Sequence, residues 1–397
     1  MRIHRPLAEA VVQSLQLIFV ENRYADKVIE KILKQNPRWG ARDRRFIAET
    51  TYDIVRWKRL YQTITQSGDS DFWKWLAVWI IQRDFELADW REFSAINKKE
   101  IKSKLQSDYT RKIKESIPDW LDELGSVQLG DRWEKELGAL NQQAHVVLRA
   151  NTLKVSPKEL SRLLIADEIE TDTSPDFPEA LVLKRRQNIF QSEQFKEGLF
   201  EVMDAASQTI AHFLDAKLSM RVIDACAGGG GKTLHLSALM KNKGKIIAMD
   251  TEQWKLDELG KRARRAGAFN IETRLIDSGK VIKRLENSSD RLLLDVPCSG
   301  IGVLKRNPDA KWKLNLEFVQ KVNELQKNIL NDYCTMVKPA GKMVYSTCSI
   351  LPIENENVVK DFLEKHSNFK LEEEKRCWPS EGFDGFYMAR ISKSKDN

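Results

Sequence analysis

From about residue 201 onward, short apolar segments alternate with longer stretches of helical spacing, and this alternation constrains the fold more than any other feature of the chain. The predicted strands are residues 221–224, 245–250, 272–276, 291–295 and 342–347, and the predicted helices are residues 232–242, 252–266, 279–286 and 315–337. Apolar strands that alternate with helices are typical of βαβ units, whose parallel sheet is covered on both faces. The sequence therefore predicts an α/β fold with a doubly wound, Rossmann-like sheet over residues 201–397.

Two further domains are predicted upstream of this sheet. Residues 1–115 carry apolar side chains at helical spacing, such as Val11, Leu15 and Ile18, and show little strand-like alternation, which indicates an all-helical domain. Residues 116–200 change to short mixed segments, with strands expected at 146–150 and 180–183 and a helix at 157–165. We therefore expect a small α+β module between the helical domain and the sheet.

Composition excludes several classes of protein. The 397 residues are 42% hydrophobic and 31% charged, which is typical of a globular chain rather than a disordered one. No apolar run is long enough to span a membrane, and the N-terminal segment has the spacing of an amphipathic helix instead of a signal peptide. We expect a cytoplasmic monomer with no membrane partner.

The cysteines and histidines do not form a recognisable metal motif. The odd number of cysteines and the lack of any Cys-x-x-Cys pair argue against a disulfide framework and against a zinc site. The histidines are dispersed along the sequence, at positions 4, 145, 212, 235 and 366. We therefore expect no bound metal and a reducing environment.

The positive charge is concentrated in the first domain. Residues 1–115 contain 23 Lys and Arg against 16 Asp and Glu, whereas the remainder holds 42 of each. A basic domain attached to a neutral one suggests a module that docks on a polyanion such as RNA. Ordinary solvated helix faces would give the same count, so charge alone leaves both interpretations open.

Two cysteines lie in nearly identical settings. Cys298 in Asp295-Val-Pro-Cys-Ser-Gly and Cys348 in Tyr345-Ser-Thr-Cys-Ser each follow a predicted strand. Parallel strands end at one edge of the sheet, where open α/β proteins bind ligands, so two thiols are expected together there. A single free cysteine is usually a small buried hydrophobe, but two such cysteines, each followed by Ser, suggest covalent catalysis.

A glycine-rich turn follows the first strand of the predicted sheet, in Asp224-Ala-Cys-Ala-Gly-Gly-Gly-Gly-Lys-Thr233. A P-loop would need glycine at position 226, which is Cys226, and the dinucleotide fingerprint would need glycine at position 233, which is Thr233. Both spacings fail, which leaves a nucleoside cofactor without a pyrophosphate, S-adenosylmethionine above all. Acids at the ends of the next strands could bind its ribose and adenine, and these are Asp250, Asp277 and Asp295.

These groups match the needs of methyl transfer to a pyrimidine carbon. C5 of cytosine becomes nucleophilic only after a thiolate adds at C6, and a base must then remove the C5 proton so that the thiol can leave. Cys348, Asp295 and Cys298 could supply the nucleophile, the contact to the ring N3 and the help with elimination.

The same segments resemble the Nop/Sun type of RNA cytosine-C5 methyltransferases. The densest similarity lies in 295–303, 306–312 and 345–350, and the turn 226–232 is similar to that family's Cys-Ala-Ala-Pro-Gly-Gly-Lys, preceded by a matching 204–208. Residues 42–47 with Tyr52 and Arg56 resemble the NusB-like helical domain of the bacterial Sun, or RsmB, branch. Residues 118–121 and 148–151 resemble its middle module.

The resemblance implies a role for each matching residue. Cys348 would be the nucleophile, Cys298 would aid product release, and Asp295 would orient the base. The residues implied at the S-adenosylmethionine site are Cys226, Ala227, Gly228, Gly229, Gly230, Gly231, Lys232, Asp250, Asp277 and Asp295. The implied substrate is a cytidine of structured RNA, most simply 16S ribosomal RNA.

Two rival functions stay open. DNA cytosine-C5 methyltransferases use the thiol of a Pro-Cys segment, which would exchange the roles of Cys298 and Cys348. A non-catalytic RNA-binding factor of ribosome assembly could keep the same fold. The Ser-Thr-Cys-Ser segment and the NusB-like front favour the RNA enzyme.

The chain departs from the family pattern at three places. Gly228-Gly229 replaces Ala-Pro, Ile301 stands where Thr is usual, and Asp53 stands where Gly is usual. None of these is an inferred catalytic group, so they bear on cofactor affinity and docking.

The loop after Cys298 has two interpretations. Lys305, Arg306, Lys311 and Lys313 surround Trp312, and such cations could grip phosphates beside an extruded base. Packing of the loop inside the protein would explain Trp312 equally well.

Overall fold

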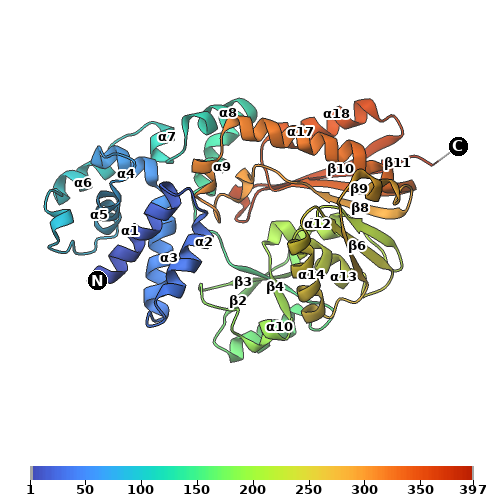
Figure 1. Ribbon diagram of the computed structural model, residues 1–397, viewed down its shortest axis with the longest axis horizontal. Coiled ribbons are helices and arrows are strands. Elements are labelled where there is room, and N and C mark those ends of the chain that lie inside the picture. Colours follow the sequence, from blue (N-terminus) through green and yellow to red (C-terminus); the bar gives the residue numbers. More distant parts are fainter. Residues whose placement is uncertain (1–2, 396–397) are drawn as a thin grey trace. The chain divides into compact units, whose positions relative to one another are not determined.

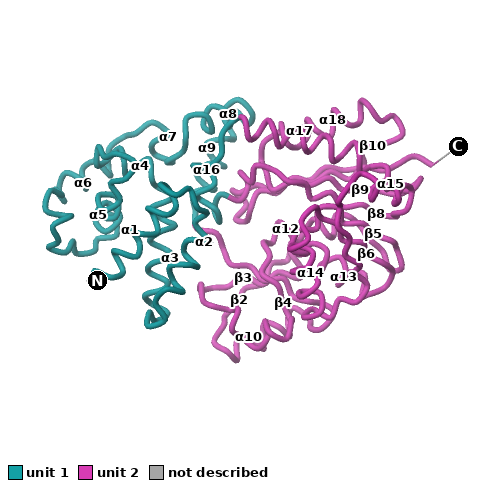
Figure 2. The backbone as a smooth tube through the Cα atoms, in the orientation of Figure 1, with its two compact units in different colours: residues 1–142, 304–316 teal, residues 143–303, 317–397 magenta. Residues whose placement is uncertain are grey.

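The computed structural model describes residues 3–395. Residues 1–2 of the predicted domain 1–115 and residues 396–397 of the predicted domain 201–397 lie outside the description. The chain divides into two compact units (Figure 2). The first comprises residues 1–142 and 304–316, and the second comprises residues 143–303 and 317–397. The three-domain division at 115 and 200 stays a prediction, although helices continue past residue 115 to Leu140.

The first unit is helical throughout its described part (Figure 1). Its helices are α1 (Arg5–Phe19), α2 (Ala25–Gln35), α3 (Ala41–Arg56), α4 (Lys58–Thr65), α5 (Phe72–Gln82), α6 (Lys98–Leu105), α7 (Arg111–Lys114), α8 (Asp119–Leu129), α9 (Arg132–Leu140) and α16 (Ala310–Lys313). Helix α5 is apolar on nearly all sides and lies at the centre of the unit, where Trp75 is fully buried. A helix that is hydrophobic all round must be enclosed by others, and α1, α3, α4 and α6 pack against it.

The segment 304–316 belongs to this helical unit although it lies far along the chain. The indole of Trp312 donates to the carbonyl of Val55 at 2.7 Å, and the Asp309 carboxylate accepts the backbone N–H of Ala25 at 3.0 Å. Lys311 is only 1% exposed and donates to the side chain of Asn141 at 3.1 Å. Lys305 is 3% exposed. The prediction that these cations grip phosphates is therefore wrong for Lys305 and Lys311, and packing inside the helical unit explains Trp312.

A small antiparallel sheet begins the second unit, in the strand order β2-β3-β1-β4. Its elements are β1 (Val147–Ala150), α10 (Pro157–Ala166), β2 (Thr171–Ser174), β3 (Phe177–Leu183), α11 (Glu193–Lys196) and β4 (Phe200–Val202). Ser156 starts α10 by accepting the N–H of Glu159, and proline at the first helical position fits that start. Leu148, Leu160 and Leu181 form the core between α10 and the sheet.

The large sheet has seven strands in the order β10-β11-β9-β8-β5-β6-β7. Its strands are β5 (Arg221–Asp224), β6 (Lys245–Asp250), β7 (Ile271–Leu275), β8 (Ser289–Asp295), β9 (Val337–Thr347), β10 (Phe369–Cys377) and β11 (Phe386–Lys393). The accompanying helices are α12 (Ala205–Phe213), α13 (Gly231–Leu239), α14 (Gln253–Ala266), α15 (Gly279–Lys283), α17 (Leu316–Tyr333) and α18 (Glu356–Lys365). Neighbouring strands are parallel from β7 to β9, and β11 runs antiparallel to both of its neighbours.

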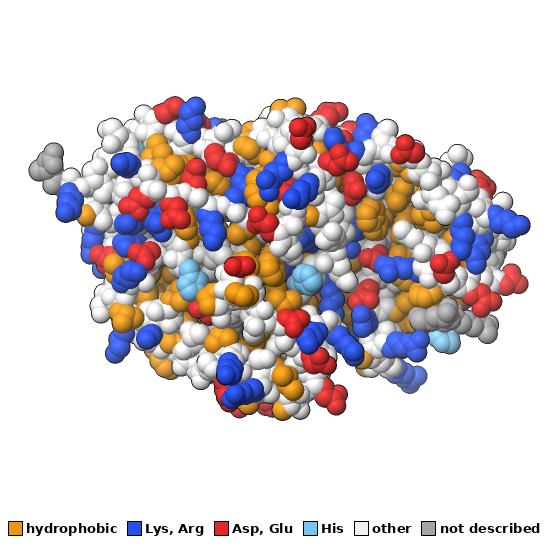
Figure 3. Space-filling view, turned by 180° about the vertical axis from the view of Figure 1, so that it is seen from behind, with side chains coloured by type: hydrophobic (Ala, Val, Ile, Leu, Met, Phe, Trp, Pro, Cys, Tyr) orange, Lys and Arg blue, Asp and Glu red, His pale blue; other side chains and the backbone are white. Residues whose placement is uncertain are grey.

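This architecture confirms the predicted fold class. The five predicted strands of the large sheet are β5 to β9, and the order changes direction between β5 and β8, where an open α/β sheet binds its ligands. Among residues 3–395, no helix is long and apolar enough to cross a membrane. On the face drawn in Figure 3, basic and acidic side chains are interspersed, and the docking of the helical unit on RNA stays a prediction.

Candidate active site

The two cysteines singled out in the sequence lie together at the carboxyl edge of the large sheet. Cys298 follows β8 and Cys348 follows β9, and these strands pair in parallel with Asp295 opposite Ser346. The Sγ atoms of the two cysteines are 3.2 Å apart, within the distance at which one thiol donates a hydrogen bond to the other sulfur. Two sulfur atoms at this distance can act on neighbouring atoms of one substrate.

The environment of Cys298 disfavours its thiolate form. The hydrogen bond to Cys348 and burial raise the pKa of Cys298 well above its ordinary value. Cys298 therefore keeps its proton at neutral pH and can donate its S–H to the Cys348 sulfur.

A carboxylate–ammonium pair lies at the same edge. The Lys232 Nζ atom is 2.6 Å from Oδ2 of Asp295, and the hydroxyl of Ser346 donates to the other carboxylate oxygen at 3.0 Å. Although burial opposes it, the negative charge of Asp295 raises the pKa of Lys232. Lys232 therefore stays cationic, and Asp295 has a fixed orientation.

The glycine-rich turn lies between β5 and α13. Gly228 and Gly230 have φ angles of +53° and +85°, values that residues other than glycine rarely adopt. A Cβ atom at Gly230 would lie 2.5 Å from Leu259, whereas within the described chain one at Gly228 would meet nothing within 4 Å. The turn therefore packs against α14 at Gly230 and leaves free space beside Gly228.

The acids predicted near this turn have different environments. Asp250, at the end of β6, accepts the backbone N–H of Gly228 at 2.9 Å. Asp277, beyond β7, is exposed and accepts the hydroxyl of Ser278 at 2.8 Å. The structure thus brings Asp250 to the turn, and Asp277 lies on the surface beyond the neighbouring strand.

The other residues of the predicted cofactor set form the turn itself. The N–H of Ala227 donates to the carbonyl of Met249 at 2.9 Å, and the carbonyl of Gly229 accepts the guanidinium of Arg262. Burial raises the pKa of Cys226 well above its ordinary value, so this thiol keeps its proton at neutral pH. Gly231 begins α13.

Asp224, below the turn, is a buried acid with an unused oxygen. The hydroxyl of Thr233 donates to Oδ2 at 2.7 Å, and Oδ1 has no hydrogen-bond partner within residues 3–395. Burial raises the pKa of Asp224 to about 7.

Sequence reasoning missed Glu354, which joins the two cysteine segments. This fully buried carboxylate accepts the N–H of Ser299 at 2.8 Å and its hydroxyl at 2.5 Å, and it also accepts the hydroxyl of Ser349. Ser299 and Ser349 are the residues that follow Cys298 and Cys348, so one side chain fixes both loops. The only sequence signal was a pair of Cys-Ser dipeptides, each with a hydroxyl that needed a partner.

Comparison with known proteins covers most of the second unit. The family described as 16S rRNA methyltransferase RsmB/F matches residues 211–392, and an RsmF/B-like ferredoxin-like domain matches residues 117–190. A Synechocystis protein named "Probable ribosomal RNA small subunit methyltransferase B" is 36% identical over 65% of this chain, and ribosomal RNA small subunit methyltransferase B of Klebsiella pneumoniae is 31% identical over 70% of it. The matched regions span 58% and 66% of the length of those two relatives.

A solved structure supports the similarity over nearly the entire chain. The crystal structure of PH0851 aligns with a TM-score of 0.84 and 26% sequence identity, covering 99% of this chain and 100% of that one.

Proposed function

Because the chain belongs to the RsmB/F family of rRNA methyltransferases, we propose that it methylates C5 of a cytidine in 16S ribosomal RNA, with S-adenosylmethionine as the methyl donor. The observation that carries the proposal is the pair of sulfur atoms 3.2 Å apart beside Asp295 and Lys232. Methyl transfer to a nitrogen or an oxygen needs no covalent thiol, whereas transfer to a pyrimidine carbon does.

The residues around the glycine turn fit a nucleoside cofactor. The turn would let a ligand approach closely because Gly228 has no side chain, and Asp250 at the end of β6 offers a carboxylate where a ribose hydroxyl pair is commonly bound. The unused Oδ1 of Asp224 is a further buried acceptor. When bound, S-adenosylmethionine supplies the electrophilic sulfonium methyl group. Asp277, which follows the next strand, β7, would accept the adenine amino group.

The first chemical step is assigned to Cys348. Its thiolate would form a bond to C6 of the cytosine, and the electron pair of the C5–C6 double bond would move to C5, which accepts the methyl group. Asp295, held by Lys232 and Ser346, would hydrogen-bond the N3 edge of the ring and keep it in register. The protonated Cys298 would stabilise the Cys348 thiolate before attack.

The second step releases the product. A water molecule from the solvent would accept the C5 proton, the electron pair of the C5–H bond would form the double bond again, and the bond between C6 and the Cys348 sulfur would break, which returns the thiolate. We assign assistance in this step to Cys298, because its sulfur lies beside that of Cys348. The base must leave the RNA stack to reach these groups, and the basic charge of residues 1–115 supports docking of the RNA on the helical unit.

The experiment is a methyl-transfer assay with radiolabelled S-adenosylmethionine on 16S rRNA, tRNA and duplex DNA in parallel. The proposal predicts label in rRNA, its position given by bisulfite mapping. Cys348→Ala should abolish turnover, and Cys298→Ala should accumulate a covalent protein–RNA adduct that survives denaturing electrophoresis. Cys334→Ala, which removes a buried thiol under the sheet, is the matched control and should turn over normally.

Each rival function predicts a different result. A DNA enzyme would label duplex DNA, with Cys298 as the attacking thiol. A non-catalytic assembly factor would bind rRNA and label no substrate. Full activity in Cys348→Ala would disprove the assignment of the nucleophile even if rRNA is methylated.

A further inference from the structure

Two histidines that are dispersed in the sequence meet a glutamate in the second unit. Glu179 comes from β3, His212 from α12 and His235 from α13. The Nε2 atom of His212 is 2.8 Å from Oε2 of Glu179, and the Nε2 atom of His235 is 3.7 Å from the same oxygen. One possible ligand atom from each residue lies within 4.8 Å of the other two. In a tetrahedral zinc site with bonds of about 2.0–2.1 Å, ligand atoms are roughly 3.3 Å apart, so small side-chain adjustments suffice.

His235 points independently to a bound ligand. It is 0% exposed, and neither of its ring nitrogens has a hydrogen-bond partner among the described residues. Buried polar atoms in native proteins almost always have a partner, and an unpaired one calls for an explanation such as an ion. A metal bound to Nε2 would satisfy the nitrogen that faces Glu179.

The charge states suit a cation. Burial lowers the pKa of His235 to about 3, so its ring is neutral, the form that binds metals. Although burial opposes ionisation, the hydrogen bond from His212 and the nearby imidazole of His235 hold the pKa of Glu179 well below its usual range, so it is a carboxylate. The buried guanidinium of Arg149 acts on both Glu179 and His235 and reduces the affinity expected for a divalent ion.

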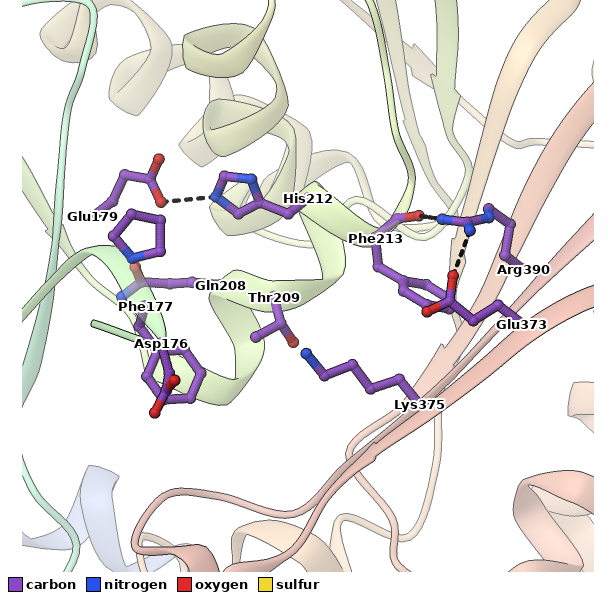
Figure 4. A pocket seen from close by; sticks show the side chains of 11 residues that line it. Asp176, Phe177, Glu179, Gln208, Thr209, His212, Phe213, Glu373, Lys375 and Arg390 are labelled. Atoms are coloured by element: carbon purple, nitrogen blue, oxygen red, sulfur yellow. Dashed lines mark hydrogen bonds and ion pairs between the residues drawn. The ribbon is translucent and has the colours of Figure 1, made fainter. Parts of the chain in front are cut away.

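One side of this cluster is accessible from a cavity of about 300 Å³ (Figure 4). Glu179 and His212 lie on its wall, and the side chain of His212 points toward Glu179 and is 40% exposed. An ion could enter from this cavity, and water could fill a coordination position that the protein leaves open.

We propose that Glu179, His212 and His235 bind one Zn²⁺ ion, with the remaining coordination position directed to the cavity. Two imidazoles and one carboxylate form a known zinc ligand set with an open position, whereas Mg²⁺ and Ca²⁺ prefer oxygen ligands. The expectation of no metal rested on cysteine spacing and on the scattered histidines, and this ligand set contains no cysteine. The ion would tie β3 of the small sheet to α13, the helix that begins at the glycine turn, so its main role would be structural. The inference does not depend on the methyl-transfer proposal.

The test uses the full-length chain with Cys298→Ser and Cys348→Ser, because the paired thiols could themselves bind zinc. This parent is stripped with a chelator and titrated with Zn²⁺ by calorimetry, and with Co²⁺ by visible absorption. His212→Ala and His235→Ala each remove one ligand, and His4→Ala, at an exposed position of the helical unit, is the matched control. Since His235 is buried and its variant could fail to fold, the half-exposed His212 gives the decisive comparison.

We expect one equivalent of Zn²⁺ in the parent and in His4→Ala, with affinity at least about tenfold lower in His212→Ala. Zn²⁺ should raise the thermal midpoint of the parent and of His4→Ala more than that of His212→Ala. The Co²⁺ complex should show the visible bands of a four-coordinate ion without sulfur charge-transfer bands. Binding of less than one equivalent, or equal affinity in the parent and His212→Ala, would overturn the proposal in favour of a simple histidine–carboxylate pair.

Discussion

Substitution of Glu354 by Gln should loosen both cysteine loops at once. The carboxylate has two donors on each oxygen, since Oε1 accepts Ser299 N–H at 2.8 Å and the Gln326 amide at 3.2 Å, while Oε2 accepts the hydroxyls of Ser299 and Ser349. A Gln side chain can keep its oxygen at only one of these positions, and its best orientation leaves the amide nitrogen facing the two hydroxyls. The two hydrogen bonds to the retained oxygen then become neutral ones, each about 1 kcal/mol weaker, and the two hydroxyls must accept from the amide instead of donating, so the local cost is at least about 2 kcal/mol. Glu354→Ala leaves four donors without their acceptor and should cost about 4 kcal/mol or more.

The assay is hydrogen exchange of the segments that contain Ser299 and Ser349, together with methyl-transfer kinetics. A cost of about 2 kcal/mol corresponds to exchange roughly thirtyfold faster in Glu354→Gln, since about 1.4 kcal/mol is a factor of ten. The maximal rate should fall at least about tenfold because the sulfur atoms lose their fixed spacing. Glu364→Gln, on the exposed side of α18, is the control and should change neither. Unchanged exchange and rate in Glu354→Gln would refute the reasoning.

Three further substitutions test particular features by thermal unfolding. Gly230→Ala should destabilise the protein by about 2 kcal/mol or more, because Gly230 has a φ of +85° and the added Cβ would contact Leu259. Gly231→Ala should be neutral or stabilising, because its Cβ would meet no described atom within 4 Å. Equal effects of the two substitutions would contradict the packing described for the turn. Burial and the charge of Arg56 lower the pKa of Lys311 well below its usual value, so Lys311→Met should raise the thermal unfolding midpoint at pH 7. The affinity for RNA should not change, because this lysine is buried. Weaker RNA binding would instead support the interpretation in which this lysine contacts phosphates. Burial raises the folded-state pKa of Asp224 to about 7, so above about pH 4 the native protein holds a proton that the unfolded chain releases. The free energy of unfolding should therefore decline as the pH rises from about 4 to 7, by about 1.4 kcal/mol for each unit of difference between the two pKa values. Asp224→Asn should remove this decline. An unchanged pH profile would contradict the raised pKa.

Much of the central sheet could be predicted because its strands are buried on both faces. Continuous apolar runs such as those of β6 and β8 read clearly as strands, and β5 and β6 have the predicted bounds. The strands β10 and β11 were missed. β10 lies at the edge of the sheet and reads Phe-Lys-Leu-Glu-Glu-Glu-Lys-Arg-Cys, a charged sequence with most side chains exposed. Such edges are protected by charge, so they lack the apolar signal.

The candidate site was accessible from sequence only where strand order determines proximity. Cys298 and Cys348 could be placed together because β8 and β9 end at one edge. Glu354 could not, since its hydrogen bonds depend on how the two loops fold back. The same limit hid the cluster of Glu179, His212 and His235, which comes from a small sheet and two helices.

The destination of segment 304–316 was equally hidden. It leaves the loop after Cys298 and packs into the helical unit through Trp312 and Asp309. A basic loop sequence looks the same whether its lysines face solvent or are buried in a neighbouring unit. Long-range packing decided between the two interpretations.

The most direct test of the account is the identity of the sulfur that bonds to RNA. The adduct of Cys298→Ala with its RNA substrate would be digested with nuclease and protease and the modified peptide sequenced by mass spectrometry. The account predicts a single nucleotide adduct on Cys348, and none in Cys348→Ala. An adduct on Cys298 in Cys348→Ala, or the absence of any adduct in a variant that still binds RNA and cofactor, would contradict it.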